Sequence, residues 1–210
     1  SVSMATTDAQ WATSVQTALT IGAPYIGAGS TPSDFTTKQQ WVDYAEKIDH
    51  LGELSRAQGV QYMVHSHDWE FEQVFDGETG YDILQANTSP ENVVFELDLY
   101  WATKAGADPL DVIDDYGDRI ELLHVKDLAE DGSITTVGEG TIDFAPIFAA
   151  AGEDIEYYVI ERDPPFDGSP FDPFEPTQKG FEYLTGLETV PFVDVPLGTL
   201  FYKDMSWLYN

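Results

Sequence analysis

The stretch Val64-His65-Ser66-His67-Asp68-Trp69-Glu70-Phe71 contains two of the four histidines of the chain. It continues an apolar run that begins at Val60, and it becomes polar within a few residues. Histidine and carboxylate side chains bind transition metals and transfer protons near neutral pH. The stretch therefore indicates either a metal and proton-transfer site or a polar strand end with no further role.

The same change from apolar to polar recurs in four segments of the chain. The segments 60–67, 93–99, 120–126 and 157–161 carry, toward their carboxyl ends, His65 and His67, Asp98, His124 and Glu161. In a parallel α/β barrel these ends converge on one face, where active sites are built. Burying such groups is costly unless they pair or bind a cation. Two histidines and two carboxylates match Mn²⁺, Fe²⁺, Co²⁺ or Zn²⁺ better than Ca²⁺.

Each residue taken singly also has a structural interpretation. A histidine at a strand end can serve only as a hydrogen-bonding group, and Asp98 can cap the loop that follows it. Glu161 can pair with Arg162 or Lys126. Glu96 alternates with Asp98 on the same strand face, so one of the two can be a salt-bridge residue. The repetition at four successive segments favours the joint site.

Predicted strands and helices alternate along the chain. Strands are expected at 23–29, 60–67, 93–99, 120–126 and 157–161, and helices at 37–58, 81–86, 109–116, 144–151 and 178–187. A proline- and aspartate-rich loop is expected over 163–176, and an aromatic tail over 191–210. Continuously apolar strands that alternate with helices predict a parallel sheet covered by helices. No Gly-x-Gly-x-x-Gly motif follows a strand, so a dinucleotide-binding fold is unsupported.

The charge balance is strongly acidic. The chain has 38 aspartates and glutamates against 9 lysines and arginines, which gives a net charge of −29. Self-repulsion of this size destabilises a compact fold in dilute buffer, and salt screens it. The composition resembles that of proteins from halophiles with a salt-rich cytoplasm, and an ordinary acidic protein is the alternative. A chain this acidic binds phosphate backbones poorly, so no nucleic-acid partner is expected.

Composition also restricts the metal chemistry and the cellular location. The chain has no cysteine, which excludes disulfides and thiolate metal sites. No run of 18 apolar residues is present, so no membrane span is expected. The first 30 residues lack a signal-type pattern, and a cytoplasmic location is therefore predicted.

Five motifs together resemble one known family. In chain order they are Val64–Phe71, Phe95–Trp101 with Lys104–Pro109, Leu122–Asp127, Val137–Phe144 and Val159–Asp163. They are similar to signatures of the sugar phosphate isomerase/epimerase proteins in the xylose isomerase-like superfamily. The resemblance covers residues 15 to 187. We therefore expect residues 1–187 to form a partial barrel domain, and residues 188–210 to form a separate tail.

The resemblance implies an α/β fold of the (β/α)₈ TIM-barrel type with one bound divalent metal. Carried over by position, the metal ligands are His65, Asp98, His124 and Glu161. The same comparison places His67, Trp101 and Lys126 against a sugar substrate. The implied reaction is removal of a proton next to a carbonyl to give an enediolate, and hence isomerisation or epimerisation. Loss of a neighbouring hydroxyl gives a dehydratase or lyase instead.

Two departures from the family pattern affect these expectations. Ketose epimerases of the superfamily have a glutamate at the first metal position, where this chain has His65. We expect Glu161 to be the first acid/base group, with Glu70 or His67 as the second. The barrel is also expected to be incomplete, with about five to six parallel strands, because the first strands are missing and residues 1–4 resemble the end of the third.

An open barrel exposes a strand edge and part of its core. We therefore expect a homo-oligomer, a second chain, or the tail 190–209 to complete it, and an expression fragment is the alternative. A catalytically inactive or structural sugar- or metal-binding protein is the competing functional hypothesis. No basic cluster accompanies the site, which favours unphosphorylated substrates.

Overall fold

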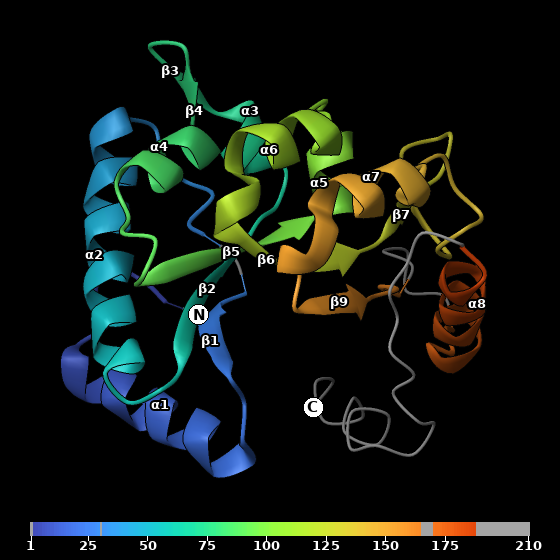
Figure 1. The fold of residues 1–210 in the computed structure, drawn as a ribbon. Helices are drawn as coiled ribbons and strands as arrows, with labels where there is room; N and C mark the ends of the chain where they lie inside the picture. Colours follow the sequence, from blue (N-terminus) through green and yellow to red (C-terminus); the bar gives the residue numbers. More distant parts are fainter. Residues whose placement is uncertain (1, 30, 165–169, 188–210) are drawn as a thin grey trace.

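Five parallel strands form a curved sheet in the order β1-β2-β5-β6-β9 (Figure 1). The computed structural model describes residues 2–29, 31–164 and 170–187. The strands are β1 (Tyr25–Ala28), β2 (Gln61–His65), β5 (Val93–Asp98), β6 (Ile120–Val125) and β9 (Tyr157–Ile160). Each pairs with the next of these strands along the chain, and all pairs are parallel. The predicted incomplete barrel is confirmed as a curled half-barrel of five strands.

Helices follow the strands and pack along the outer side of the sheet (Figure 1). They are α1 (Asp8–Ile21), α2 (Lys38–Arg56), α3 (Trp69–Glu72), α4 (Gly80–Ala86), α5 (Leu99–Lys104), α6 (Pro109–Tyr116), α7 (Phe144–Ala151) and α8 (Phe174–Thr185), with 3₁₀ turns η1 (Gly117–Arg119) and η2 (Gly152–Asp154). Two hairpins, β3 (Val74–Phe75) with β4 (Glu78–Thr79) and β7 (Asp127–Leu128) with β8 (Ile134–Thr135), complete the described elements.

Local sequence accounts for the longest helix. The Thr37 side chain accepts a hydrogen bond from the Gln40 backbone, and the Gln40 side chain accepts from the Thr37 backbone, which forms a capping box at the start of α2. One helix face is fully buried, including Trp41, Tyr44 and Ile48. The predicted helix 37–58 is thus confirmed, with small differences at its ends.

Helix α1 was not predicted from the sequence. Only three of its residues are buried, Trp11, Val15 and Ala18, so its apolar periodicity is weak. Its ends do carry signals, namely a capping box between Thr7 and Gln10 and a left-handed Gly22. These caps, rather than the apolar pattern, mark the helix.

Two further expectations differ from the structure. Helix α8 begins at Phe174, so the end of the expected loop 163–176 is helical, while residues 165–169 lie outside the described residues. Residues 2–4 form no strand, although Val2 is buried in the core. The aromatic tail expected over 188–210 also lies outside the described residues.

The central strand β5 is buried along its whole length, whereas the edge strands β1 and β9 are only partly covered. The two edges approach each other at one point. The Tyr25 hydroxyl lies 2.7 Å from Glu121 Oε2 and 2.8 Å from Glu156 Oε2, and its ring meets that of Tyr157 edge-on. The Tyr25 side chain therefore links the first strand to the last two.

Asp127 organises the loop that follows β6. Its Oδ2 accepts hydrogen bonds from the backbone N–H groups of Gly138 and Gly140, both at 2.9 Å. Its Oδ1 accepts from Leu128 at 2.8 Å and from Ile142 at 3.2 Å. A Cβ atom on Gly140 would lie 2.3 Å from Asp127 Oδ1, so only glycine allows this approach.

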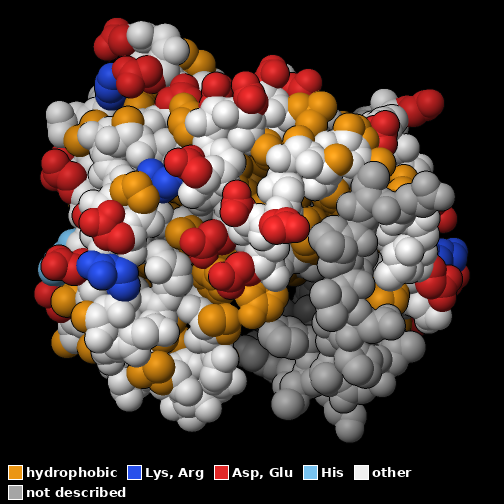
Figure 2. Space-filling model, in the orientation of Figure 1, with side chains coloured by type: hydrophobic (Ala, Val, Ile, Leu, Met, Phe, Trp, Pro, Cys, Tyr) orange, Lys and Arg blue, Asp and Glu red, His pale blue; other side chains and the backbone are white. Residues whose placement is uncertain are grey.

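Acidic side chains are spread over the face of the molecule in Figure 2, with few lysines and arginines among them. Within the described residues, no helix is both long and apolar enough to cross a membrane. The acidic surface agrees with the charge of the sequence, and the halophile interpretation remains a prediction.

Candidate metal and substrate site

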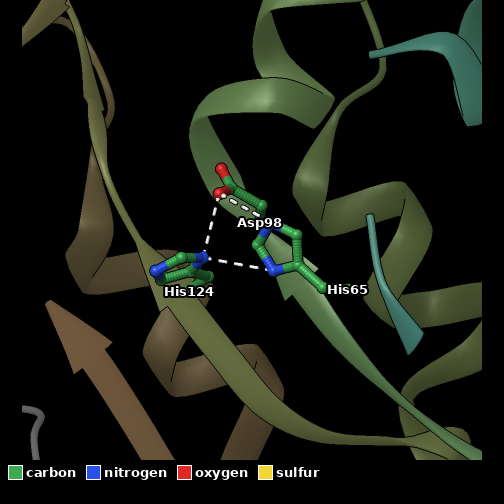
Figure 3. Close-up of side chains that lie close together, drawn as sticks. All are labelled: His65, Asp98 and His124. Carbon is green, nitrogen blue, oxygen red and sulfur yellow. Dashed lines mark hydrogen bonds and ion pairs between the residues drawn. The ribbon is translucent and has the colours of Figure 1, made fainter. Parts of the chain in front are cut away.

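Three of the predicted metal ligands meet at the carboxyl ends of neighbouring strands. His65 ends β2, Asp98 ends β5, and His124 lies near the end of β6. His124 Nδ1 is 3.2 Å from Asp98 Oδ2 and 3.2 Å from His65 Nδ1 (Figure 3). His65 Nε2 is 3.6 Å from Asp98 Oδ2. All three side chains are buried.

These three residues fit a divalent metal. Each offers one ligand atom, and the three atoms lie within 4.8 Å of one another. Asp98 Oδ2 is buried and accepts no hydrogen bond of good geometry from the described residues, although His124, His65 and Lys126 nitrogens lie 3.2–3.6 Å away. A buried carboxylate oxygen without a hydrogen bond is unfavourable unless a cation compensates it. Two imidazoles and a carboxylate are suitable ligands for Mn²⁺, Fe²⁺, Co²⁺ or Zn²⁺.

Glu161 lies beside this cluster. Its Oε2 is 3.1 Å from His124 Nε2, on the opposite side of the imidazole from Asp98, and 2.5 Å from Lys126 Nζ. Burial raises the pKa of Glu161, but the hydrogen bond and charge of His124 and the charge of Lys126 outweigh it and lower this pKa to about 2. The carboxylate is therefore ionised at neutral pH. Its role as a fourth ligand stays a prediction.

Lys126 is surrounded by carboxylates. Its Nζ lies 3.5 Å from Asp98 Oδ2, 2.5 Å from Glu161 Oε2 and 3.1 Å from Asp163 Oδ2. Burial alone lowers the pKa of Lys126, but the charges of Asp98 and Glu161 raise it above its ordinary value. Sequence reasoning did not select Asp163, although it ends the last of the family motifs.

Glu96 contacts His65 from the neighbouring strand. Its Oε2 lies 2.8 Å from His65 Nδ1, and the two residues are register partners of β5 and β2. Both side chains are buried. A carboxylate on one imidazole nitrogen fixes the ring so that the other can bind a metal. Strand alternation alone left open which of Glu96 and Asp98 joins the cluster, while the family resemblance selected Asp98. Asp98 lies in the cluster, and Glu96 contacts His65 Nδ1 instead.

A cavity of about 450 Å³ opens beside the cluster and is lined by Gly29, Met63, His65, His67, Glu96, Trp101, His124, Lys126, Glu161 and Asp163. The predicted substrate-facing residues His67, Trp101 and Lys126 therefore all face one space. The His67 ring stacks on Trp69 with 4.4 Å between centroids, and lies 5.3 Å from Trp101. His67 Nδ1 and Trp101 Nε1 are buried without a hydrogen-bond partner among the described residues.

The imidazole of His67 is uncharged near neutral pH. Burial is the main cause, and repulsion by His65 adds to it, so that the pKa of His67 falls to about 4. The cavity wall formed by His67 and Trp101 is thus aromatic and neutral, which suits the apolar face of a sugar-like ring.

Glu70 is placed differently from the other predicted site residues. Its side chain is fully buried and does not line the cavity. One carboxylate oxygen accepts a hydrogen bond from the Thr31 hydroxyl, and the other accepts from the His67 backbone N–H at 2.9 Å. Trp69 Nε1 donates to Thr31 Oγ1 at 2.9 Å. Burial raises the pKa of Glu70 to about 7. Glu70 therefore braces the loop that carries His67, and nothing in the sequence distinguished Thr31.

A curved sheet of parallel strands, with helices outside and polar residues gathered at the carboxyl ends, defines the TIM-barrel class of folds. Within that class, the chain belongs to the xylose isomerase-like TIM barrel family, whose sequence profile matches residues 5–185. This confirms the resemblance found in the motifs.

Known proteins similar to the chain are enzymes of this family. Inosose dehydratase from Lacticaseibacillus casei is 28% identical over 177 residues, which cover 74% of this chain and 57% of that protein. The chain thus spans little more than half the length of this curated relative. A solved sugar phosphate isomerase/epimerase from Parabacteroides distasonis has a TM-score of 0.75 and 28% identity, covering 89% of this chain and 65% of that one. The IOLI protein, solved with a bound zinc atom, shares the fold at 16% identity and a TM-score of 0.64, covering 85% and 68%.

Proposed function

We propose that the chain carries the site of a divalent-metal-dependent enzyme that removes a proton next to the carbonyl of a polyhydroxylated ketone. The observation that carries this proposal is the placement of one ionised carboxylate, Glu161, and one ammonium, Lys126, beside the His65–Asp98–His124 cluster in the same cavity. Dehydration is the outcome we favour, with isomerisation or epimerisation as the second outcome.

His65, Asp98 and His124 would hold the ion, with Glu161 as a candidate fourth ligand. A divalent ion bound there would polarise a carbonyl oxygen and make the neighbouring carbon more acidic. Mn²⁺, Fe²⁺, Co²⁺ and Zn²⁺ are all compatible with these ligands.

Side chains of the cavity would carry out the remaining steps, which are proton removal, stabilisation of the developing charge and loss of water. An oxygen of Glu161 takes the proton from the carbon next to the carbonyl, and the electron pair of the broken C–H bond moves toward the carbonyl oxygen. Lys126 Nζ donates a hydrogen bond to the charge that develops there. As the carbonyl re-forms, a carbon–carbon double bond forms and the C–O bond of the next hydroxyl breaks. The departing hydroxide takes the proton held by Glu161 and leaves as water.

We favour dehydration over epimerisation because, of the two predicted acid/base carboxylates, Glu161 lines the cavity and Glu70 does not, which leaves His67 as the candidate second base for epimerisation. Epimerisation by two bases requires a proton donor on each face of the substrate, and among the described residues Glu70 is fully buried with both oxygens engaged. Glu161 is the remaining predicted acid/base carboxylate, and it lines the cavity. The curated relative named inosose dehydratase supports the same choice.

The experiment follows both steps of the reaction. The chain loaded with Mn²⁺ or Zn²⁺ is incubated with an inosose in D₂O, and C–H exchange and formation of the unsaturated ketone are recorded. Glu161→Gln should reduce both rates by about 10² or more, because a positioned general base contributes about 10²–10⁴. Glu153→Gln, which alters an exposed glutamate, is the matched control and should leave both rates unchanged.

Two results would favour the alternative hypotheses. Exchange without the unsaturated product would favour an isomerase or epimerase. A protein that binds stoichiometric metal but shows neither reaction would favour the inactive, sugar-binding alternative. A second chain or second copy that completes the barrel, and a cytoplasmic location, remain predictions. The mass of the protein in molar salt tests the former.

A further inference from the structure

The cavity beside the metal cluster has a negative charge balance. Among the described residues that line it, Lys126 is the only lysine or arginine, whereas Glu96, Glu161 and Asp163 are acidic. Asp98 contributes a fourth carboxylate directly against the Lys126 ammonium. Histidines that bind a metal are neutral ligands. Four carboxylates against one ammonium therefore leave one negative charge uncompensated even after a divalent ion has bound.

Nearby cations do not change this balance. Lys104 Nζ lies 3.5 Å from Asp68 and 4.3 Å from the ring centre of Trp101, so a carboxylate and an aromatic face already engage it. The Arg162 guanidinium donates to the backbone oxygen of Asp163 and lies 5.3 Å from the Phe171 ring centre. Neither residue lines the cavity.

Asp163 differs in its contacts from the other three carboxylates of this region. Asp98 belongs to the metal cluster, Glu161 contacts His124, and Glu96 contacts His65. Among the described residues, Asp163 makes its ion pair only with Lys126, at 3.1 Å, from the loop that follows β9. Its negative charge therefore opposes the one ammonium group that an anionic substrate could otherwise approach.

We propose that Asp163, by adding a further negative charge beside Lys126 where Glu161 and Asp98 already lie, makes this site select uncharged polyhydroxylated ketones and reject phosphorylated or carboxylated ones. This inference rests on the proposed function and names the substrate class of the same site. Bringing like charges together in a cavity is strongly unfavourable. A charged and an uncharged substrate therefore differ more in binding free energy than two substrates that differ by one methylene group. Asp163 is thus a specificity-determining residue.

The test compares two probes that differ only in a phosphate group, fructose and fructose 6-phosphate. Binding of each to the metal-loaded full chain is measured by calorimetry at one fixed salt concentration, because screening weakens the contrast. C–H exchange in D₂O is measured on the same samples. Asp163→Asn is compared with Asp154→Asn, which removes the same charge from an exposed position ahead of β9.

The unmodified protein should bind fructose at least about tenfold more tightly than its phosphate. Asp163→Asn should narrow this ratio several-fold, and Asp154→Asn should preserve it. Equal or tighter binding of the phosphate, no measurable binding of either sugar at millimolar concentration, or an unchanged ratio in Asp163→Asn would overturn the inference. If the binding preference holds but neither probe nor an inosose undergoes exchange, the proposed function fails while the selectivity stands.

Discussion

Glu96 Oε2 lies 2.8 Å from His65 Nδ1 across two adjacent parallel strands, with both side chains buried. By the family resemblance, His65 stands at the position where ketose epimerases of the superfamily have a glutamate metal ligand. We propose that in this chain a histidine would supply the ligand atom and that the Glu96 carboxylate, from the next strand, orients it.

This pair predicts a measurable loss of metal affinity in Glu96→Gln. The amide keeps the shape of the side chain but removes the charge that orients His65, and such outer partners typically contribute 10–100-fold in affinity. A competition titration with a metal-binding dye measures the effect directly. Glu91→Gln, at an exposed position just ahead of the same strand, should retain full affinity. Equal affinities in the two variants would show that Glu96 does not orient the ligand.

Glu70 predicts a pH-dependent contribution to stability. Its pKa in the folded protein is raised to about 7 from an ordinary value of 4.5, so the folded state holds this proton more tightly than the unfolded state. The penalty of ionising the buried carboxyl is absent below pH 4.5, grows as the pH rises, and is complete above pH 7. Its upper limit is on the order of 3 kcal/mol.

The measurement is the free energy of unfolding of the wild type and of Glu70→Gln at pH 5 and pH 8. Relative to the wild type, Glu70→Gln should have a higher free energy of unfolding at pH 8 than at pH 5, because glutamine does not ionise. Glu72→Gln, an exposed change on the same short helix, should show no such shift. A pH-independent difference for Glu70→Gln would contradict the prediction.

Asp127 predicts a stability loss through backbone hydrogen bonds. Its two oxygens accept from four backbone N–H groups, and asparagine offers only one acceptor oxygen. Asp127→Asn should lower the free energy of unfolding by about 1 kcal/mol or more, because it leaves partly buried backbone donors and the buried Ile142 N–H with fewer acceptors. Urea denaturation measures this, with the exposed Asp114→Asn as the control. A variant as stable as the control would rule out this role for the carboxylate.

The net charge of −29 predicts a requirement for salt. Helical circular dichroism should decrease below about 0.5 M salt, because screening no longer relieves repulsion among the surface carboxylates. A potassium chloride series at constant pH is sufficient, and the non-ionic osmolyte sucrose at matched osmolarity is the control. Full structure in dilute buffer would contradict the halophile interpretation.

The convergence of His65, Asp98 and His124 could be predicted from sequence because parallel strands in chain order bring equivalent ends together. His65, Asp98 and His124 each follow an apolar run, and this alone placed them on one edge. Alternation along a strand gives the face on which a side chain lies, but it does not say how deeply the side chain is buried or which neighbours it contacts. Alternation therefore did not distinguish Glu96 from Asp98, and only the family resemblance selected Asp98.

The part of the site built by loops was less predictable. The depth of Glu70 depends on Thr31, which is 39 residues away in the sequence, and the position of Asp163 depends on the turn after β9. Neither arrangement follows from local periodicity. Helix α1 was missed for a related reason, since a helix with few buried residues shows little apolar pattern and is marked mainly by its caps.

The pairing of each sheet strand only with its nearest neighbours in the chain also bears on how the protein forms during synthesis. Register partners such as Tyr25 and Gln61 are far apart in the sequence, so each pairing is a non-local contact that pays a loop-closure entropy before it forms. The three residues of the metal cluster come from three consecutive units. On a ribosome, this cluster can be assembled before β9 has emerged, and Lys126 acquires its partners Glu161 and Asp163 only afterwards.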